Sequence, residues 1–270
     1  MKLKFVFTIL FTAYLSVQAF SQDYYAQFKS ISNDTAALGR FLTEWNKNKP
    51  DDPELYVAYY NYFIRKSRTQ LANLDKFQQG EESLQLKDPT TGKVVAYRNG
   101  GVTYDRDLLE QGFHYIDIGI EKYPSRLDMR FGKIYMLGRI NDYERFTETL
   151  VAAIDYSQKI DLKWTWAYST PLDNPKESML SAEQDYITQL LDAGDSQLDN
   201  IKKIAEAVLK YYPDNVANLS NLAITYTLKE DYSNALDILL KANTIAPTDG
   251  IVLNDIAYCY DSKGDKLNAI

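Results

Sequence analysis

Histidine and cysteine side chains are the first candidates for chemistry, and this chain has one of each, His114 and Cys259. A histidine-rich metal site is therefore excluded, and a Ser-His-Asp arrangement would have to use the single His114 ring. No serine stands in the Gly-x-Ser-x-Gly context of a nucleophile elbow. His114 follows Phe113 on an expected helix, and Cys259 falls between the packing positions Ala257 and Tyr260. A structural role fits both residues better than a catalytic one. We therefore expect the chain not to be an enzyme.

Phosphate and metal chemistry also lack a motif. Gly100-Gly101 stands without the glycine spacing or the Lys-Ser/Thr pair that cradles a nucleotide. Acidic clusters at residues 51–52, 192–199 and 261–265 lie at expected helix boundaries, where carboxylates cap helices. None has calcium-loop spacing. A carboxylate pair for glycoside hydrolysis stays open, because such a pair meets only in the fold, but nothing in the sequence selects one. We expect no metal and no cofactor.

Three large aromatic residues alternate along one segment: Trp164, Trp166 and Tyr168. Alternation puts all three on one face of an extended strand. Exposed there, they could stack on sugar rings or clamp a partner, so they are candidate ligand-stacking residues. The alternative is that the segment folds back and buries them against the helices, as large aromatic residues usually are.

The composition narrows the class of partner. The chain has a formal net charge of -7, and 45% of its residues are hydrophobic. An acidic balance argues against nucleic acid, because neutralising phosphates needs clustered Lys and Arg. The single cysteine cannot form an intramolecular disulfide, so stability must come from apolar burial.

The N-terminus has the three-part layout of a secretory signal peptide. Lys2 and Lys4 precede an apolar run over residues 5–17, and small residues follow at Ala19 and Ser21. The run falls short of the roughly 20 apolar residues that a membrane-spanning helix needs. We therefore expect residues 1–21 to be removed, no membrane span afterwards, and a periplasmic or secreted protein.

The stretch 216–247 reads as one complete helix-turn-helix unit that closes on Pro247, 34 residues after Pro213. Its expected packing positions recur at helical spacing on two helices. They are Leu219, Leu222, Ala223, Tyr226, Ala235, Leu239 and Ala242. This pattern resembles the tetratricopeptide repeat (TPR), in which bulky, small and aromatic residues stand at these positions before a helix-ending proline.

The resemblance implies an all-α solenoid of about four to five repeats over residues 22–270, the last one incomplete. Two insertions interrupt it, at about residues 66–105 and 159–176. Within the first, residues 83–87 and 94–98 favour a β-hairpin around Pro89 and Gly92, and residues 99–101 indicate another sharp turn. After the second, the expected packing positions are Met179, Ala182, Tyr186 and Leu190. A solenoid normally ends in a polar cap, so the sequence favours a piece of a longer protein over a frayed end.

TPR proteins usually hold a peptide or protein on the concave face lined by the first helix of each repeat. By resemblance the partner-binding residues are Asn61, Arg65, Ser220, Ile224, Thr227, Asn254 and Tyr258. Ser220, Ile224 and Ile251 stand where some members carry a carboxylate clamp, which argues against capture of a C-terminal carboxylate. The sequence thus predicts an exported scaffold that binds protein or peptide partners in the cell envelope of a bacterium. The alternative is an envelope component that binds a glycan or small ligand through the aromatic insertion.

Overall fold

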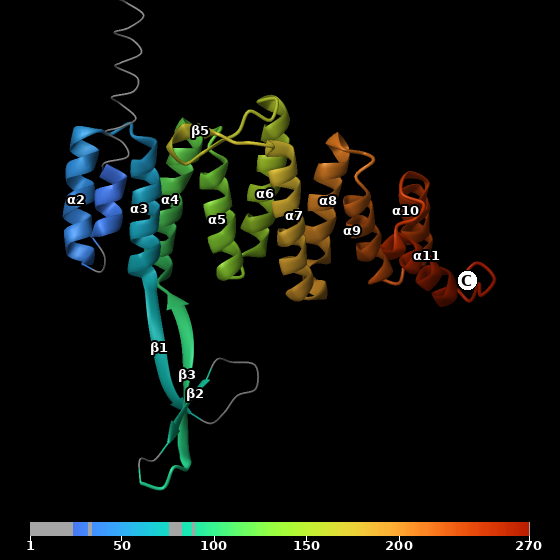
Figure 1. Ribbon diagram of the computed structural model, residues 1–270, viewed down its shortest axis with the longest axis horizontal. Helices are drawn as coiled ribbons and strands as arrows, with labels where there is room; N and C mark the ends of the chain where they lie inside the picture. The colour runs from blue at the N-terminus through green and yellow to red at the C-terminus, as the bar shows by residue number, and fades with distance from the viewer. Residues whose placement is uncertain (1–23, 32–33, 76–82, 88–89, 270) are drawn as a thin grey trace, which may run out of the picture. The chain divides into compact units, whose positions relative to one another are not determined.

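The computed structural model describes residues 24–31, 34–75, 83–87 and 90–269. The chain divides into two compact units, Met1–Pro124 and Ser125–Ile270. The described residues are mostly helical, and two small sheets accompany the helices, as the sequence predicts at this level of detail (Figure 1). The expected export segment, residues 1–21, lies outside the described residues. Among those described, no helix has the length and apolarity that crossing a membrane requires.

The first unit is built from short helices that start at aspartates. Residues 24–30 are helical, and they precede α2 (Thr35–Asn48), α3 (Pro53–Ser67) and α4 (Arg106–Lys122). The carboxylate before each labelled helix accepts an N–H of the first turn, which satisfies a donor that the helix itself leaves unpaired. These caps are Asp34, Asp52 and Asp105. The core around α2 and α3 consists of Phe28, Leu38, Leu42, Trp45, Leu55 and Ala58.

A three-stranded antiparallel sheet lies between α3 and α4 in the chain and extends away from the ends of these two packed helices (Figure 1). Its strands are β1 (Arg68–Asp75), β2 (Ser83–Lys87) and β3 (Val94–Tyr104), in the order β1-β3-β2. The expected hairpin has its counterpart in the pairing of β2 with β3. The sharp turn expected at residues 99–101 is wrong. Those residues continue β3, where Gly100 pairs with Ala72 of β1.

The second unit is a series of antiparallel helices in chain order (Figure 1). They are α5 (Leu127–Arg139), α6 (Tyr143–Lys159), α7 (Pro175–Asp192), α8 (Leu198–Tyr211), α9 (Val216–Thr227), α10 (Tyr232–Ile245) and α11 (Gly250–Ser262). One apolar cluster joins α9, α10 and α11 through buried Leu219, Ala223, Leu239, Ala242 and Val252, among others. Short polar turns connect most neighbours, as helix pairs require.

The segment between α6 and α7 is a compact insert. Strand β4 (Thr165–Trp166) pairs with β5 (Thr170–Pro171) across a 3-10 turn, η1 (Ala167–Ser169), in which Tyr168 has a φ of 58°. The insert is tied to the start of α5, because the Thr165 N–H donates to the carbonyl of Ser125 over 2.8 Å. These bonds fix the direction of the side chains that β4 carries.

Candidate functional site

The predicted partner-binding residues of the first unit lie on α3. Asn61 is half-buried and Arg65 is exposed. They are four residues apart and therefore share one helix face. Nothing further connects them to a ligand.

The predicted partner-binding residues of the second unit lie on α9 and α11. Ser220, Ile224 and Thr227 are half-buried, whereas Asn254 and Tyr258 are exposed. The Thr227 hydroxyl lies 3.6 Å from the sulfur of Cys259, so part of its polar capacity is used in the contact between the two helices. The structure thus brings α9 and α11 together at the C-terminal end of α9, and leaves Tyr258 55% exposed beside them.

The expected strand face that would carry Trp164, Trp166 and Tyr168 together is not formed, and the alternative of burial holds for Trp164. The paired strand covers only two residues, and the turn that follows redirects Tyr168, which is half-buried. Trp164 is 1% exposed and Trp166 is 40% exposed. A buried ring cannot stack on a ligand, which removes Trp164 from the candidate site and leaves Trp166 as its exposed member.

Trp164 is buried against a cation. The guanidinium carbon of Arg130 lies 5.6 Å from the Trp164 ring centre and 4.9 Å from that of Tyr156. The two rings are 5.7 Å apart. Burial lowers the pKa of Arg130 from its ordinary value, and the nearby Tyr156 opposes this shift. Delocalised guanidinium groups tolerate such a site because they stack on aromatic faces. These contacts pack Trp164 of the insert against α5 and α6.

Trp166 is the outer end of a series of edge-to-face aromatic contacts. Its ring centre lies 6.1 Å from that of Phe131, which lies 5.8 Å from Tyr186, which in turn lies 5.3 Å from Phe146. Phe146 is fully buried, whereas Phe131 and Tyr186 are half-buried. Burial raises the pKa of Tyr186 to about 12, so its hydroxyl stays protonated even at alkaline pH. Trp166 is therefore an exposed ring that packs against a series of half-buried and buried aromatic side chains.

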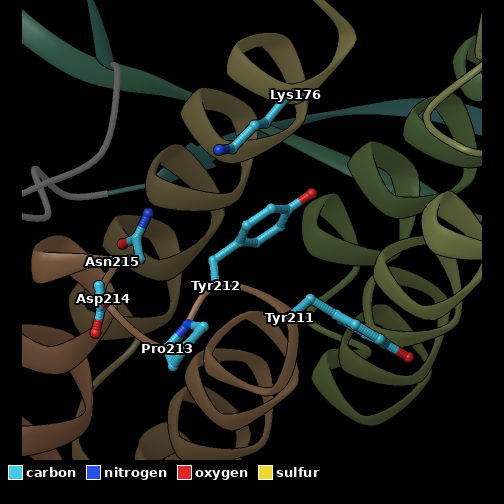
Figure 2. Close-up of a pocket in the computed structure, with 6 residues that line it drawn as sticks. All are labelled: Lys176, Tyr211, Tyr212, Pro213, Asp214 and Asn215. Carbon is cyan, nitrogen blue, oxygen red and sulfur yellow. The ribbon is translucent and has the colours of Figure 1, made fainter.

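A cavity of about 390 Å³ lies where α7 begins and α8 passes into α9. Its walls are Lys176, Tyr211, Tyr212, Pro213, Asp214 and Asn215. Figure 2 shows Lys176 reaching toward the ring of Tyr212, while Tyr211 points away. The Lys176 ammonium lies 4.7 Å from the centre of the Tyr212 ring. The size suits a small ligand, and the lining mixes charges of both signs with aromatic rings.

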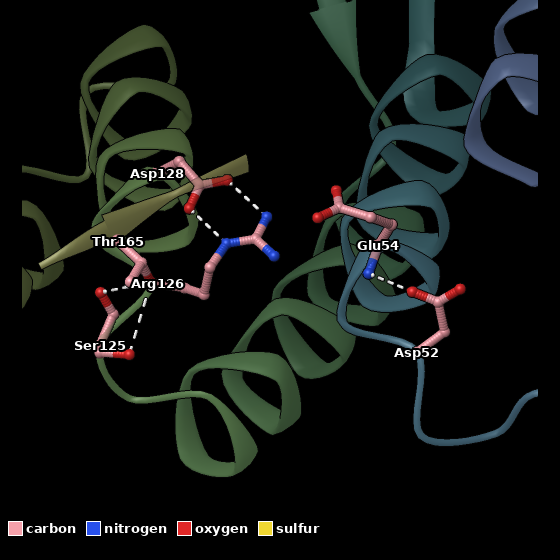
Figure 3. A network of polar contacts seen from close by, with 6 residues as sticks. All are labelled: Asp52, Glu54, Ser125, Arg126, Asp128 and Thr165. Atoms are coloured by element: carbon pink, nitrogen blue, oxygen red, sulfur yellow. Dashed lines mark hydrogen bonds and ion pairs between the residues drawn. The ribbon is translucent and has the colours of Figure 1, made fainter. Parts of the chain in front are cut away.

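Figure 3 shows polar contacts that shape the starts of helices. In the second unit, the buried Arg126 donates two parallel hydrogen bonds to Asp128, over 2.7 and 2.8 Å. Such a bidentate pair fixes the geometry of both side chains. In the first unit, Asp52 accepts the Glu54 N–H over 3.0 Å. These contacts order backbone, and we assign them no chemistry.

The contact between α7 and α9 carries a polar group that the sequence analysis missed. Glu183 on α7 and Asn218 on α9 are both fully buried. The Asn218 side-chain amide donates to Oε2 of Glu183 over 3.1 Å, and that of Gln184 donates to the same oxygen over 2.8 Å. Asn221 donates to Gln184 over 3.0 Å. We refer to these four residues as the α7–α9 seam. The sequence feature that could have revealed this seam is Glu183, which stands four residues from both Met179 and Ile187 on the buried stripe of α7.

The single histidine and the single cysteine occupy ordinary positions. His114 is exposed, and its ring meets that of Tyr115 at 5.8 Å. Cys259 is buried, and burial raises the pKa of its thiol. In the described part of the chain, no group of three or more His, Cys, Asp or Glu side chains is arranged to hold a metal ion.

Comparisons with known proteins add little to this geometry. No family model matches the chain, and no curated protein matches it. A solved structure of MamA 41-end from Desulfovibrio magneticus RS-1 is 14% identical, covers 59% of this chain and 78% of its own, and superposes with a TM-score of 0.37. BtubC (BKLC) from P. vanneervenii is 10% identical, covers 93% of this chain and 85% of its own, and gives a TM-score of 0.31. TM-scores this low do not support a conclusion about function, which therefore rests on the described residues themselves.

Proposed function

We propose that this chain is a non-catalytic helical-repeat scaffold, and that it holds protein or peptide segments on the first helices of its helix pairs. The resemblance of residues 216–247 to a tetratricopeptide repeat supports this proposal. The observation that carries it is the exposed face of α11. Ile251 and Tyr258 are 69% and 55% exposed, and Asn254 lies between them at helical spacing. Large apolar side chains around a polar amide are typical of protein contact surfaces.

The charge distribution favours one kind of partner. The acidic excess of the chain falls within residues 125–270. Complementary charge speeds association and selects among partners more than it adds affinity. We therefore propose that the bound segment carries basic residues. The proposed place of action is the cell envelope, and support for this comes from the signal-like layout of residues 1–21.

Site-specific photo-crosslinking in living cells tests the scaffold function. A benzophenone amino acid at Tyr258 is expected to give a crosslinked adduct of one discrete mass in the envelope fraction. The matched control is Leu240, which is 41% exposed but lies on the second helix of its pair, α10. We expect no adduct from position 240, and loss of the Tyr258 adduct in an Ile251→Asp background. Equal crosslinking from both positions, or from neither, would argue against this face, and an adduct found only in the cytoplasm would argue against export.

A second candidate function is binding of a glycan or small ligand at Trp166. The observation that favours it is the 40% exposure of a ring that also makes an edge-to-face contact with Phe131. Of the three tryptophans, Trp45 and Trp164 are buried. A stacking ligand is therefore expected to quench the fluorescence of Trp166 selectively.

Titration with a panel of polysaccharides checks this second candidate. Quenching in the wild-type protein and its absence in Trp166→Phe would support it. Identical titration curves for both proteins would contradict it.

A further inference from the structure

Glu183 is buried without a countercharge. Its side chain is fully buried in the middle of α7, and its described hydrogen-bond donors are the neutral amides of Gln184 and Asn218. Both amides donate to the same oxygen, Oε2. The other oxygen, Oε1, has no hydrogen-bond partner among the described residues. A buried carboxylate normally needs a cation and donors to both oxygens.

The helices packed around Glu183 offer no such cation. Helix α9 contains no charged residue. The remaining charged residues of α7, Lys176, Glu177, Asp185 and Asp192, are exposed. The buried positions of α8 are all apolar.

The cations of α5 and α8 and the charged residues of α6 are directed elsewhere. On α5, which meets α7 through Phe131 and Tyr186, Arg130 stacks on Tyr156 and Trp164, and Arg139 is exposed. Lys133 of α5 makes no contribution to the pKa shift of Glu183. On α8, Lys202 donates to Tyr226 and Lys210 donates to Asp155 of α6, and Lys203 is exposed. On α6, Arg145 pairs with Asp142. The other charged residues of α6, Glu144, Glu148 and Lys159, are exposed.

The protonated form of Glu183 fits this environment better than the ionised form. Burial of a neutral carboxylic acid costs much less free energy than burial of a carboxylate. The acid carries its proton on one oxygen, and the other oxygen is free to accept hydrogen bonds. Oε2 accepts two, and Oε1 is available for the proton. Burial raises the pKa of Glu183 from 4.5 to about 7, although the hydrogen bonds from Asn218 and Gln184 act in the opposite direction.

We propose that Glu183 is a neutral carboxylic acid in the folded protein, and that its ionisation weakens the α7–α9 seam, so that this part of the helix series is sensitive to pH. Asn218 links Glu183 to the start of α9, because its amide also donates to Asn215, the N-terminal cap of that helix. Ionisation therefore acts on the position where α9 begins. This effect of ionisation does not depend on what the protein binds.

The direction of the pH effect follows from proton binding. Between the unfolded pKa of a glutamate and the raised folded pKa, the folded state binds more protons than the unfolded state. The favourable contribution is therefore complete below about pH 4.5 and is lost as the pH rises through about 7. The contribution of Glu183 to stability, and with it the packing of α9 on α7, is therefore expected to be greater at acid pH.

Thermal unfolding of the full chain as a function of pH tests the proposal. Glu183→Gln keeps the shape and an amide acceptor but cannot ionise. We expect the wild-type melting temperature to fall, relative to this variant, by on the order of 10 °C between about pH 5 and pH 8. Glu177→Gln, on the exposed side of α7, is the control and should follow the wild type. Parallel pH profiles for wild type and Glu183→Gln would overturn the proposal.

A direct measurement keeps the proposal testable if Glu183→Gln fails to fold. With 13C-labelled glutamate, carboxyl NMR of the wild-type protein should contain one resonance that titrates near pH 7. All glutamate resonances titrating near the ordinary value would overturn it. Amide exchange of α9, corrected for its intrinsic pH dependence, should be faster relative to the variant at high pH, and equal exchange would show that ionisation does not loosen the seam.

Discussion

Replacing Trp164 with alanine is expected to destabilise the second unit by about 3–5 kcal/mol, the range measured when a large aromatic side chain is removed from a core. Trp164 is 1% exposed and touches both Arg130 and Tyr156. The substitution opens a cavity. It also removes one of the two aromatic rings whose contact with the buried guanidinium of Arg130 offsets the free-energy cost of taking that charge out of water. Far-UV circular dichroism during urea unfolding measures the loss.

Two matched variants separate the causes. Trp166→Ala removes the same side chain from a position that is 40% exposed, and should change stability by less than about 1 kcal/mol. Trp164→Phe keeps a ring beside Arg130 and removes an indole N–H that has no hydrogen-bond partner among the described residues. It should therefore cost far less than Trp164→Ala. Equal losses for Trp164→Ala and Trp166→Ala would contradict the burial of Trp164.

Replacing Asp52 with alanine is expected to destabilise the first unit by about 2–4 kcal/mol, because one carboxylate serves two buried donors. Its Oδ1 accepts the N–H of Glu54 and caps α3, and its Oδ2 accepts the indole N–H of Trp45 over 3.1 Å. Trp45 is completely buried, so its N–H cannot turn to water instead. Urea unfolding followed by far-UV circular dichroism measures the loss, and this signal is also present in variants that lack Trp45.

A double-mutant cycle checks the second half of this argument. In a Trp45→Phe background the indole N–H is gone, so Asp52→Ala should cost only the helix cap, about 0.5–2 kcal/mol. Asp52→Asn keeps one acceptor oxygen and should be intermediate. Additive effects of Trp45→Phe and Asp52→Ala would show that the two side chains do not interact.

The sequence predicted best where burial follows a helical period. In residues 216–247, Leu219, Ala223, Ala235, Leu239 and Ala242 were expected to pack, and all five are buried. Leu222 and Tyr226, from the same pattern, are half-buried. The period of 3.6 residues is a local property, so a single repeat contains enough information to identify its inward face.

Strand pairing and register were harder to predict. Strand β1 pairs with residues that lie on average about 30 positions later in the chain, and nothing in Arg68–Asp75 alternates clearly between apolar and polar residues. The glycines at 100 and 101 suggested a turn, yet a glycine is tolerated in a strand when a partner supplies the pairing. A local signal cannot reveal a partner at that distance.

The polar seam was missed because the middle of the α7 stripe was read one residue too early, although Met179 and Leu190 of the same pattern are buried as expected. Ala182 and Tyr186 were expected to face the core, but they are half-buried, and the buried positions are Met179, Glu183, Ile187 and Leu190. The shift hid a carboxylate among apolar residues. Glutamate is so often exposed that pattern reading assigns it to the solvent side by default.

The register of the sheet between α3 and α4 has a consequence of its own. Strand β3 pairs with β1 over residues 97–104 and with β2 over residues 94–99, so it has neighbours on both sides only at Tyr97, Arg98 and Asn99. Strand β3 is therefore the central strand, and β1 and β2 pair with different stretches of it that overlap only at these three residues. Separation of β2 from the sheet would therefore leave the pairing of β1 with β3 intact. The five β3 residues nearest the helices, 100–104, pair with β1 alone.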